Sequence, residues 1–169
     1  AASLNITDGT FDANDQTVTV TGTVTIAAGK EFKTGTGTIT IGTLDNYGTL
    51  DVEGAGAIDT ITITTFTNNT DSTVEYTKAA GTSFVIPGTY YNLTSTVAGL
   101  TLKFTAGQTY TINGTTTLHN STWGSQGTYL NLASSEDGSY WWFNPLGLYN
   151  MYGVNVTDSV NMSNSWIFT

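Results

Sequence analysis

The sequence contains no cysteine and no arginine, and only four of its 169 residues are basic. Without cysteine the chain can form neither a disulfide framework nor a thiolate metal site. Thirteen acidic residues give a net charge of −9, which argues against binding to nucleic-acid phosphates or to anionic lipid. No apolar run reaches the roughly 18 residues that a membrane-spanning helix needs, so we expect no membrane insertion.

Charged residues make up only 10% of the chain, whereas an average soluble domain has about 25%. Threonine, serine, asparagine and glycine take their place. Low charge can accompany disorder, but disordered chains are also poor in aromatic and β-branched residues. This chain has 12% aromatic residues and many valines, isoleucines and threonines, which favour β-strands. We therefore expect one folded domain over residues 1–169.

Polar and apolar residues alternate in many short runs, which is the pattern of a strand with one buried face. No stretch has the apolar spacing of an amphipathic helix, so the chain is predicted to be all-β. Glycine, asparagine and aspartate, which suit tight turns, separate the runs. The clearest runs are residues 17–20, 23–26, 38–41, 49–52, 60–63, 73–76, 101–104 and 109–112.

The runs return at a nearly constant interval, with Val18, Ile39 and Ile61 in equivalent positions. Three short strands per coil of a parallel β-helix (β-solenoid) give a repeat of this length, roughly 21–22 residues. The chain would then form about seven to eight coils. A β-sandwich or jelly roll also has many short alternating strands and is the alternative. The shortness of the runs and the Gly-Thr dipeptides at expected corners favour the solenoid.

The second half of the chain carries a family resemblance. Residues 99–114, GLTLKFTAGQTYTING, resemble coils of bacterial secreted and cell-surface right-handed parallel β-helix proteins, which are adhesin-like. Residues 148–159, LYNMYGVNVTDS, with Trp-Ile-Phe at 166–168, are similar to the ending of such proteins. The similarity covers about residues 88–169, and segment 140–143 is more aromatic than the usual coil. It implies a right-handed coil and an extracellular or cell-surface location, and it brings no catalytic motif.

Residues suited to catalysis or metal binding are sparse. Lyases with a β-helix fold resemble one another in using acidic Ca²⁺ ligands together with an arginine or lysine base. Hydrolases with this fold would need carboxylates on one face of neighbouring coils. Most of the acidic residues lie beside glycine or asparagine, where we expect turns. Segment 12–15 lacks the glycine and the distal glutamate of a Ca²⁺ loop. His119, the single histidine, is expected in a turn or at the surface. We therefore expect no enzyme activity, no cofactor and no metal.

Aromatic residues concentrate near the end of the chain. The candidates for a subunit or glycan contact are Tyr140, Trp141, Trp142, Phe143, Trp166 and Phe168. If they lie in a strand, Trp141 and Trp142 must face opposite sides. Inward aromatics would close the end of the core, whereas outward ones would anchor another subunit or stack on sugar rings.

Asn-x-Ser/Thr glycosylation acceptors occur seven times, in agreement with an extracellular setting. They are Asn5, Asn68, Asn92, Asn113, Asn120, Asn155 and Asn161. Because the chain is so rich in threonine and serine, several of these would arise by chance.

The two ends of a solenoid expose unpaired backbone groups that can accept further strands. Apolar residues lie near both ends of this chain, with Leu4 and Ile6 at the start and Trp166 and Phe168 at the finish. We therefore expect a structural subunit of an extracellular filament or surface layer that joins copies of itself head to tail. An adhesin or carbohydrate-binding module that contacts surface glycans through Trp141 or Trp142 is the alternative. A glycan-cleaving enzyme would require carboxylates clustered in a groove.

Overall fold

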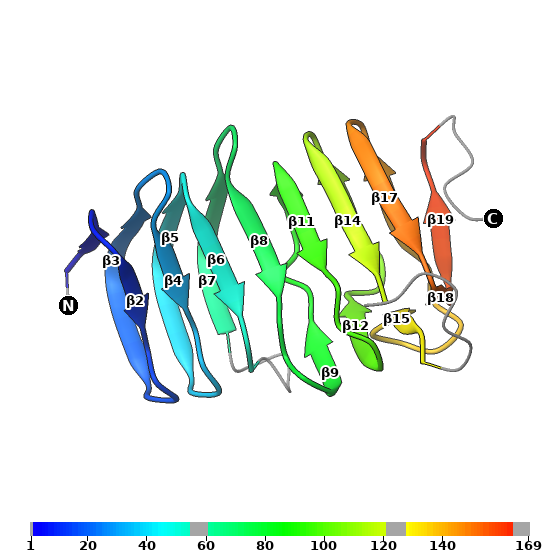
Figure 1. Ribbon diagram of the computed structural model, residues 1–169, viewed down its shortest axis with the longest axis horizontal. Helices are drawn as coiled ribbons and strands as arrows, with labels where there is room; N and C mark the ends of the chain where they lie inside the picture. Colours follow the sequence, from blue (N-terminus) through cyan, green and yellow to red (C-terminus); the bar gives the residue numbers. More distant parts are fainter. Residues whose placement is uncertain (1, 55–60, 121–127, 164–169) are drawn as a thin grey trace.

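The computed structural model describes residues 2–54, 61–120 and 128–163. In these residues the chain is all-β, and its strands stack into a solenoid of about seven turns, with the first and the last described strands at opposite ends of the long axis (Figure 1). Every described pair of neighbouring strands is parallel, so the predicted solenoid is confirmed and the sandwich alternative is wrong. Within the described ranges no helix has the length and apolar character to cross a membrane.

Nineteen strands are described. They are β1 (Leu4–Ile6), β2 (Thr10–Asp12), β3 (Val18–Ile26), β4 (Glu31–Lys33), β5 (Ile39–Asn46), β6 (Thr49–Val52), β7 (Ile61–Asn68), β8 (Thr73–Tyr76), β9 (Gly81–Phe84), β10 (Thr89–Tyr90), β11 (Asn92–Ser95), β12 (Leu100–Phe104), β13 (Thr109–Ile112), β14 (Thr115–His119), β15 (Leu130–Ser134), β16 (Trp141–Pro145), β17 (Leu148–Tyr152), β18 (Val154–Val156) and β19 (Ser159–Asn161).

One sheet runs along the described solenoid from end to end. Its seven strands lie in the order β17-β14-β11-β8-β6-β4-β2, and each coil contributes one of them (Figure 1). The other faces are formed by three four-stranded sheets, with the orders β1-β3-β5-β7, β18-β15-β12-β9 and β10-β13-β16-β19. Because β10 lies next to β7, the first and last of these follow one another along the solenoid.

The predicted repeat is also correct in register. Val18 pairs with Ile39, and Ile39 pairs with Ile61. The sequence runs 17–20 and 23–26, which we expected as separate strands, belong to the single strand β3, because a β-bulge lies between Val20 and Thr23 and bends the strand.

Glycine is required at this bend for reasons of space. A Cβ atom on Gly22 would lie 1.6 Å from the carbonyl oxygen of Ala2, and one on Gly42 would lie 2.3 Å from that of Thr21. Neither glycine has a positive φ. The close approach of the preceding coil therefore explains these two glycines, and turn conformation does not.

Inward side chains stack into ladders along the axis. On the seven-stranded sheet, Phe32, Leu50, Val74 and Leu93 follow one another in register, and each is at most 1% exposed. Burying a side chain of this kind contributes about 1.5–3 kcal/mol relative to leaving it exposed. The alternating pattern of the sequence thus becomes one continuous hydrophobic core.

Polar groups at one corner of the coil are satisfied by an asparagine ladder. The buried Asn46 side chain donates from Nδ2 to Oδ1 of Asn68 at 3.1 Å and to the carbonyl of Thr73 at 3.1 Å. Its Oδ1 accepts the backbone N–H of Gly48 at 3.0 Å. The Asn68 amide donates in turn to the carbonyl of Thr89 at 2.9 Å. These bonds supply partners to backbone groups where the chain turns between sheets.

Candidate functional site

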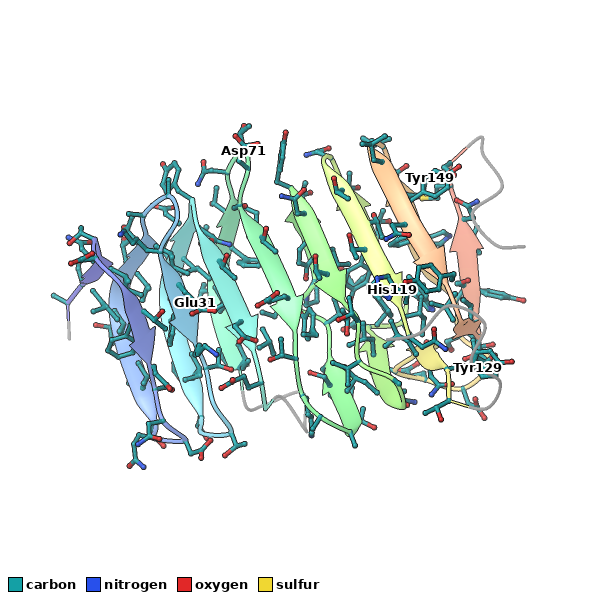
Figure 2. All side chains as sticks on the ribbon, viewed as in Figure 1. Glu31, Asp71, His119, Tyr129 and Tyr149 are labelled. Carbon is teal, nitrogen blue, oxygen red and sulfur yellow. The ribbon has the colours of Figure 1, made fainter. Side chains whose placement is uncertain are left out.

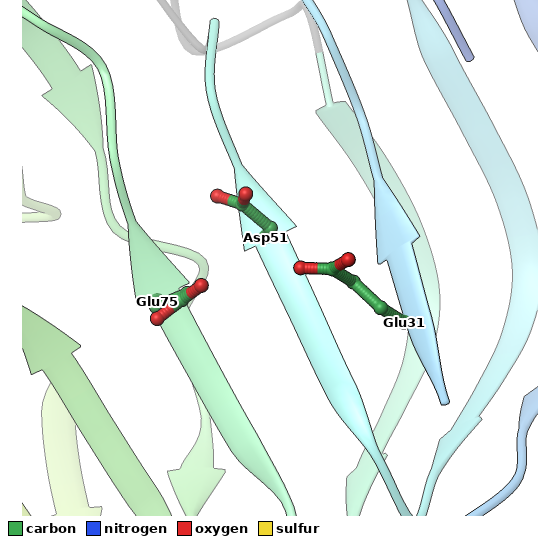
Figure 3. A group of neighbouring side chains, drawn as sticks. All are labelled: Glu31, Asp51 and Glu75. Atoms are coloured by element: carbon green, nitrogen blue, oxygen red, sulfur yellow. The ribbon is translucent and has the colours of Figure 1, made fainter. Parts of the chain in front are cut away.

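Three carboxylates meet on the outer face of the seven-stranded sheet. Glu31 on β4, Asp51 on β6 and Glu75 on β8 come from three successive coils, and their nearest oxygen atoms all lie within 4.8 Å of one another (Figure 3). Asp51 stands directly opposite Glu75 on one side and Lys33 on the other. We call Glu31, Asp51 and Glu75 the carboxylate cluster.

A hydrogen bond and an ion pair hold Asp51, the middle member of the cluster, in place. Lys33 Nζ lies 3.4 Å from Asp51 Oδ2 and 3.5 Å from Glu53 Oε1. Thr77 Oγ1 donates to Asp51 Oδ1, and this carboxylate is buried. A buried charge needs a partner of opposite sign, so the ammonium group of Lys33 has a structural role here.

The charges of the cluster shift the pKa of its member Glu75 and that of the neighbouring Lys33. Burial, together with the neighbouring charges of Asp51 and Glu31, raises the pKa of Glu75 above its ordinary value. The carboxylate of Asp51, followed by other nearby acids, raises the pKa of Lys33. Three oxygen donors could hold a divalent cation, and two carboxyl groups as close as those of Glu75 and Asp51 are the kind of pair that acid–base chemistry uses. The two surface hollows described below lie elsewhere.

Sequence reasoning missed this cluster: it placed most acidic residues in turns, and although Asp51 and Glu75 lie in the predicted strand runs 49–52 and 73–76, it did not bring these runs side by side. The three residues lie on strands, where they alternate with buried side chains. The signal that could have found them is their spacing, because Glu31, Asp51 and Glu75 follow one another at intervals close to one coil.

Segment 12–15 is a turn, as predicted. Asp12 Oδ1 accepts the backbone N–H of Asn14 at 2.7 Å, and Asn14 and Asp15 both have positive φ. Asp15 Oδ1 accepts the N–H of Thr36 at 2.7 Å and its hydroxyl at 2.8 Å. These hydrogen bonds lower the pKa of Asp15. The Asp12 carboxylate therefore caps backbone within its own turn, which is the role expected of turn acids, whereas the Asp15 carboxylate caps Thr36 in the next coil.

Apolar side chains gather on the surface of the last coil. Of the eight large hydrophobic residues that are exposed in the described part of the chain, six lie between residues 140 and 162; they are Tyr140, Leu146, Leu148, Tyr149, Val160 and Met162. Figure 2 shows Tyr149 at this end of the solenoid. Beside them is an open hollow of about 410 Å³, lined by Tyr140, Val154, Asn155, Val156, Asp158 and Ser159. We call this region the C-terminal end surface.

The opposite end is also hollowed. A smaller depression of about 250 Å³ lies between β1 and β2, and Leu4 and Phe11 contribute apolar side chains to it. Both side chains are only half-buried, although each belongs to the inward-facing row of its strand. The first coil of the described solenoid therefore leaves part of its core surface accessible.

Two predicted contact residues lie in the core. Trp141 and Phe143 are at most 1% exposed, so they cannot be reached from outside, and their assignment as contact residues is corrected. Trp142 faces the other side and is half-buried, as the alternation of a strand requires, while Tyr140 is 59% exposed. Tyr140 and Trp142 therefore remain candidates. Trp166 and Phe168 lie outside the described residues.

The glycosylation acceptors differ in accessibility. Asn120 is 2% exposed, and its amide donates to the carbonyl of Thr128, so its assignment as an acceptor is corrected. Three acceptors, Asn68, Asn92 and Asn161, are half-buried, and their side chains form hydrogen bonds. The other three, Asn5, Asn113 and Asn155, are exposed, and Asn155 also donates a hydrogen bond to Asn131.

His119 lies in strand β14 on the outer face of the sheet, so of the two expected positions, a turn or the surface, the turn is wrong. Its ring stacks on that of Tyr152 in the next coil, with 4.3 Å between centroids and 8° between planes. Both side chains are half-buried on the outer face of the seven-stranded sheet (Figure 2 labels His119). The histidine thus forms part of an aromatic ladder between coils.

Comparisons with protein-family models, curated proteins and solved structures found no match for this chain. The resemblance to adhesin-like surface proteins therefore remains a prediction. What is established is the architecture, a parallel β-solenoid with a carboxylate cluster on one face and an apolar surface at its C-terminal end.

Proposed function

We propose that this protein is a structural subunit of an extracellular filament or surface layer and that it assembles head to tail through the ends of its solenoid. The observation that carries the proposal is the concentration of exposed apolar side chains on the last coil. Leu148 is 77% exposed and Leu146 is 64% exposed. In the rest of the described chain, large exposed hydrophobic side chains are limited to Tyr47 and Tyr129. Exposed apolar patches commonly mark surfaces that another protein covers.

The strand edges support the same conclusion. At one end β1 and β2 are the outermost strands of their sheets, and at the other end β17, β18 and β19 are. An outermost strand presents backbone N–H and C=O groups that a further strand can pair with. A copy shifted along the axis meets the first copy through two different surfaces, and such a contact can repeat without limit.

Electrostatics should oppose this assembly. The net charge of −9 makes the copies repel one another, and salt screens that repulsion, with a Debye length of about 10 Å at 0.1 M. We expect assembly to increase as sodium chloride is raised from about 10 mM to about 1 M. Sulfate in place of chloride should also strengthen the hydrophobic contact at the ends, so we expect assembly to increase further.

The purified chain provides the test. Sedimentation velocity and electron microscopy should show rods that lengthen with protein concentration and salt. Leu148→Asp should abolish the lengthening, whereas Tyr47→Asp, which adds the same charge at an exposed aromatic away from the end, should not. Monodisperse monomers at high concentration and high salt would overturn the proposal.

A carbohydrate-binding module is the second candidate. The observation that favours it is the exposed ring of Tyr140 at the edge of the 410 Å³ hollow, since sugar rings stack on accessible aromatic faces. Polysaccharide pull-down with Tyr140→Ala separates the two functions. Binding that disappears in this variant while assembly persists would favour the module, and absence of binding in the parent protein would exclude it.

A further inference from the structure

We infer that strand β17 of one copy pairs in parallel and in register with strand β2 of the next, so that the seven-stranded sheet continues unbroken through the assembly. This inference rests on the proposed head-to-tail function and names the strands and the residues that meet. Strands β2 and β17 are the two outermost strands of that one sheet. Each has a paired neighbour along one edge, β4 and β14 respectively.

The direction of the strands permits this joint. All seven strands of the sheet run the same way (Figure 1), so a copy shifted along the axis without reversal brings its β2 beside β17 in parallel orientation. The outermost strands β1 and β19 do not match one another as well. The inward residues of β19 are Ser159 and Asn161, whereas those of β1 are Leu4 and Ile6.

The inward row defines the register. Within one copy, an unbroken row passes through Phe11, Phe32, Leu50, Val74, Leu93, Thr116 and Tyr149. Its first two members already pack edge to face, with 5.3 Å between ring centroids. If the next copy extends the row, its Phe11 lies against Tyr149, which is 42% exposed in the single copy. The joint would thus repeat an aromatic contact that exists within each copy.

The outward rows are compatible with the same register. One row runs from Asp12 through Lys33, Asp51, Glu75, Thr94 and Thr117 to Asn150. In the joint, Asp12 of the next copy meets the neutral amide of Asn150, and Thr10 meets Leu148. No charge occurs on β17, so the contact brings no like charges face to face.

The absence of cysteine allows a direct test of the register. In the joint, directly opposed residues have Cα atoms about 4.8 Å apart, within the roughly 4.4–6.8 Å range of disulfides. The matched pairs are Leu148→Cys mixed with Thr10→Cys, and Asn150→Cys mixed with Asp12→Cys. The mismatched pair is Leu148→Cys mixed with Asp12→Cys, in which the diagonal separation is about 7–8 Å. Each single variant is first shown to assemble like the parent under reducing conditions.

Mild oxidation followed by non-reducing electrophoresis gives the result. We expect each matched mixture to form cross-linked dimers about tenfold faster than the mismatched mixture. Equal rates in the two mixtures, or dimers formed by Leu148→Cys alone, would overturn the inference. Assembly without any matched cross-link would also overturn it but would leave head-to-tail assembly standing. Failure of the parent chain to assemble would overturn both. If one variant assembles poorly, the second matched pair decides.

Discussion

The indole of Trp141 lies flat on the ring of Phe104, with centroids 3.9 Å apart and planes 7° from parallel. Both residues are fully buried, and the indole N–H donates to the carbonyl of Thr157 at 3.1 Å. The aromatic segment that drew attention in the sequence thus serves the core of the last coils, and only its alternate residues face outward.

This stack predicts very different effects for two adjacent tryptophans. Trp141→Ala should lower the free energy of unfolding by about 3–5 kcal/mol, because it leaves a large cavity next to Phe104. Trp142→Ala removes a half-buried ring and should lower it by about 1 kcal/mol. Urea denaturation followed by circular dichroism measures both. Equal losses in the two variants would contradict the burial assigned here.

The Lys33–Asp51 pair predicts a destabilisation that a second change repairs. Lys33→Met removes the cation beside a buried carboxylate and should lower the denaturation midpoint. Adding Asp51→Asn should recover most of the loss, because no unpaired charge is then left inside. Lys30→Met is the matched control, since its partner Asp8 is 98% exposed. A control variant as unstable as Lys33→Met would argue against a special role for Asp51.

Glu75 predicts a pH-dependent gain in stability. Burial and the charges of Asp51 and Glu31 raise its pKa in the folded state, so the folded protein holds this proton more tightly than the unfolded chain does. Ionisation of Glu75 therefore destabilises the fold as pH rises above the ordinary value of 4.5. Glu75→Gln should be more stable than the parent at pH 7, by about 0.5 kcal/mol, and the difference should shrink toward pH 4.

The control for Glu75 is Glu136→Gln, which changes an exposed carboxylate in a turn. It should alter stability little at either pH. Urea midpoints at the two pH values provide the comparison. A Glu75→Gln variant that is less stable than the parent at pH 7 would contradict the argument.

The asparagine ladder predicts a specific polar requirement. Asn46→Ala removes the side-chain partner of the Gly48 N–H and of the Thr73 carbonyl. Each buried group left unpaired should lower the free energy of unfolding by about 1–3 kcal/mol. Asn113→Ala, at an exposed turn position, should change stability by less than about 0.5 kcal/mol. Thermal unfolding of the two variants measures the contrast. Similar melting temperatures would show that the ladder adds nothing to stability.

Much of the fold could be predicted from the sequence because alternation has a direct physical meaning. Val18, Ile39 and Ile61 mark one inward position in three coils, and the structure pairs them in register. The pattern did not reveal that β3 is one bent strand, since a bulge depends on how closely the preceding coil approaches Gly22. It also could not decide which of Trp141 and Trp142 lies inside, because alternation defines two sides without naming them.

Alternation and the repeat of about 21–22 residues predicted one buried face for each strand and favoured parallel coils over a sandwich. Which outward residues become neighbours could be seen only in the folded chain. Lys33 precedes Asp51 by less than one predicted repeat and Glu75 follows it by more than one, yet Asp51 stands directly opposite both. Turns of different lengths at the corners absorb the difference, so distance along the chain does not give position along the axis. The carboxylate cluster therefore depends on how the strands pair, which spacing along the sequence does not give.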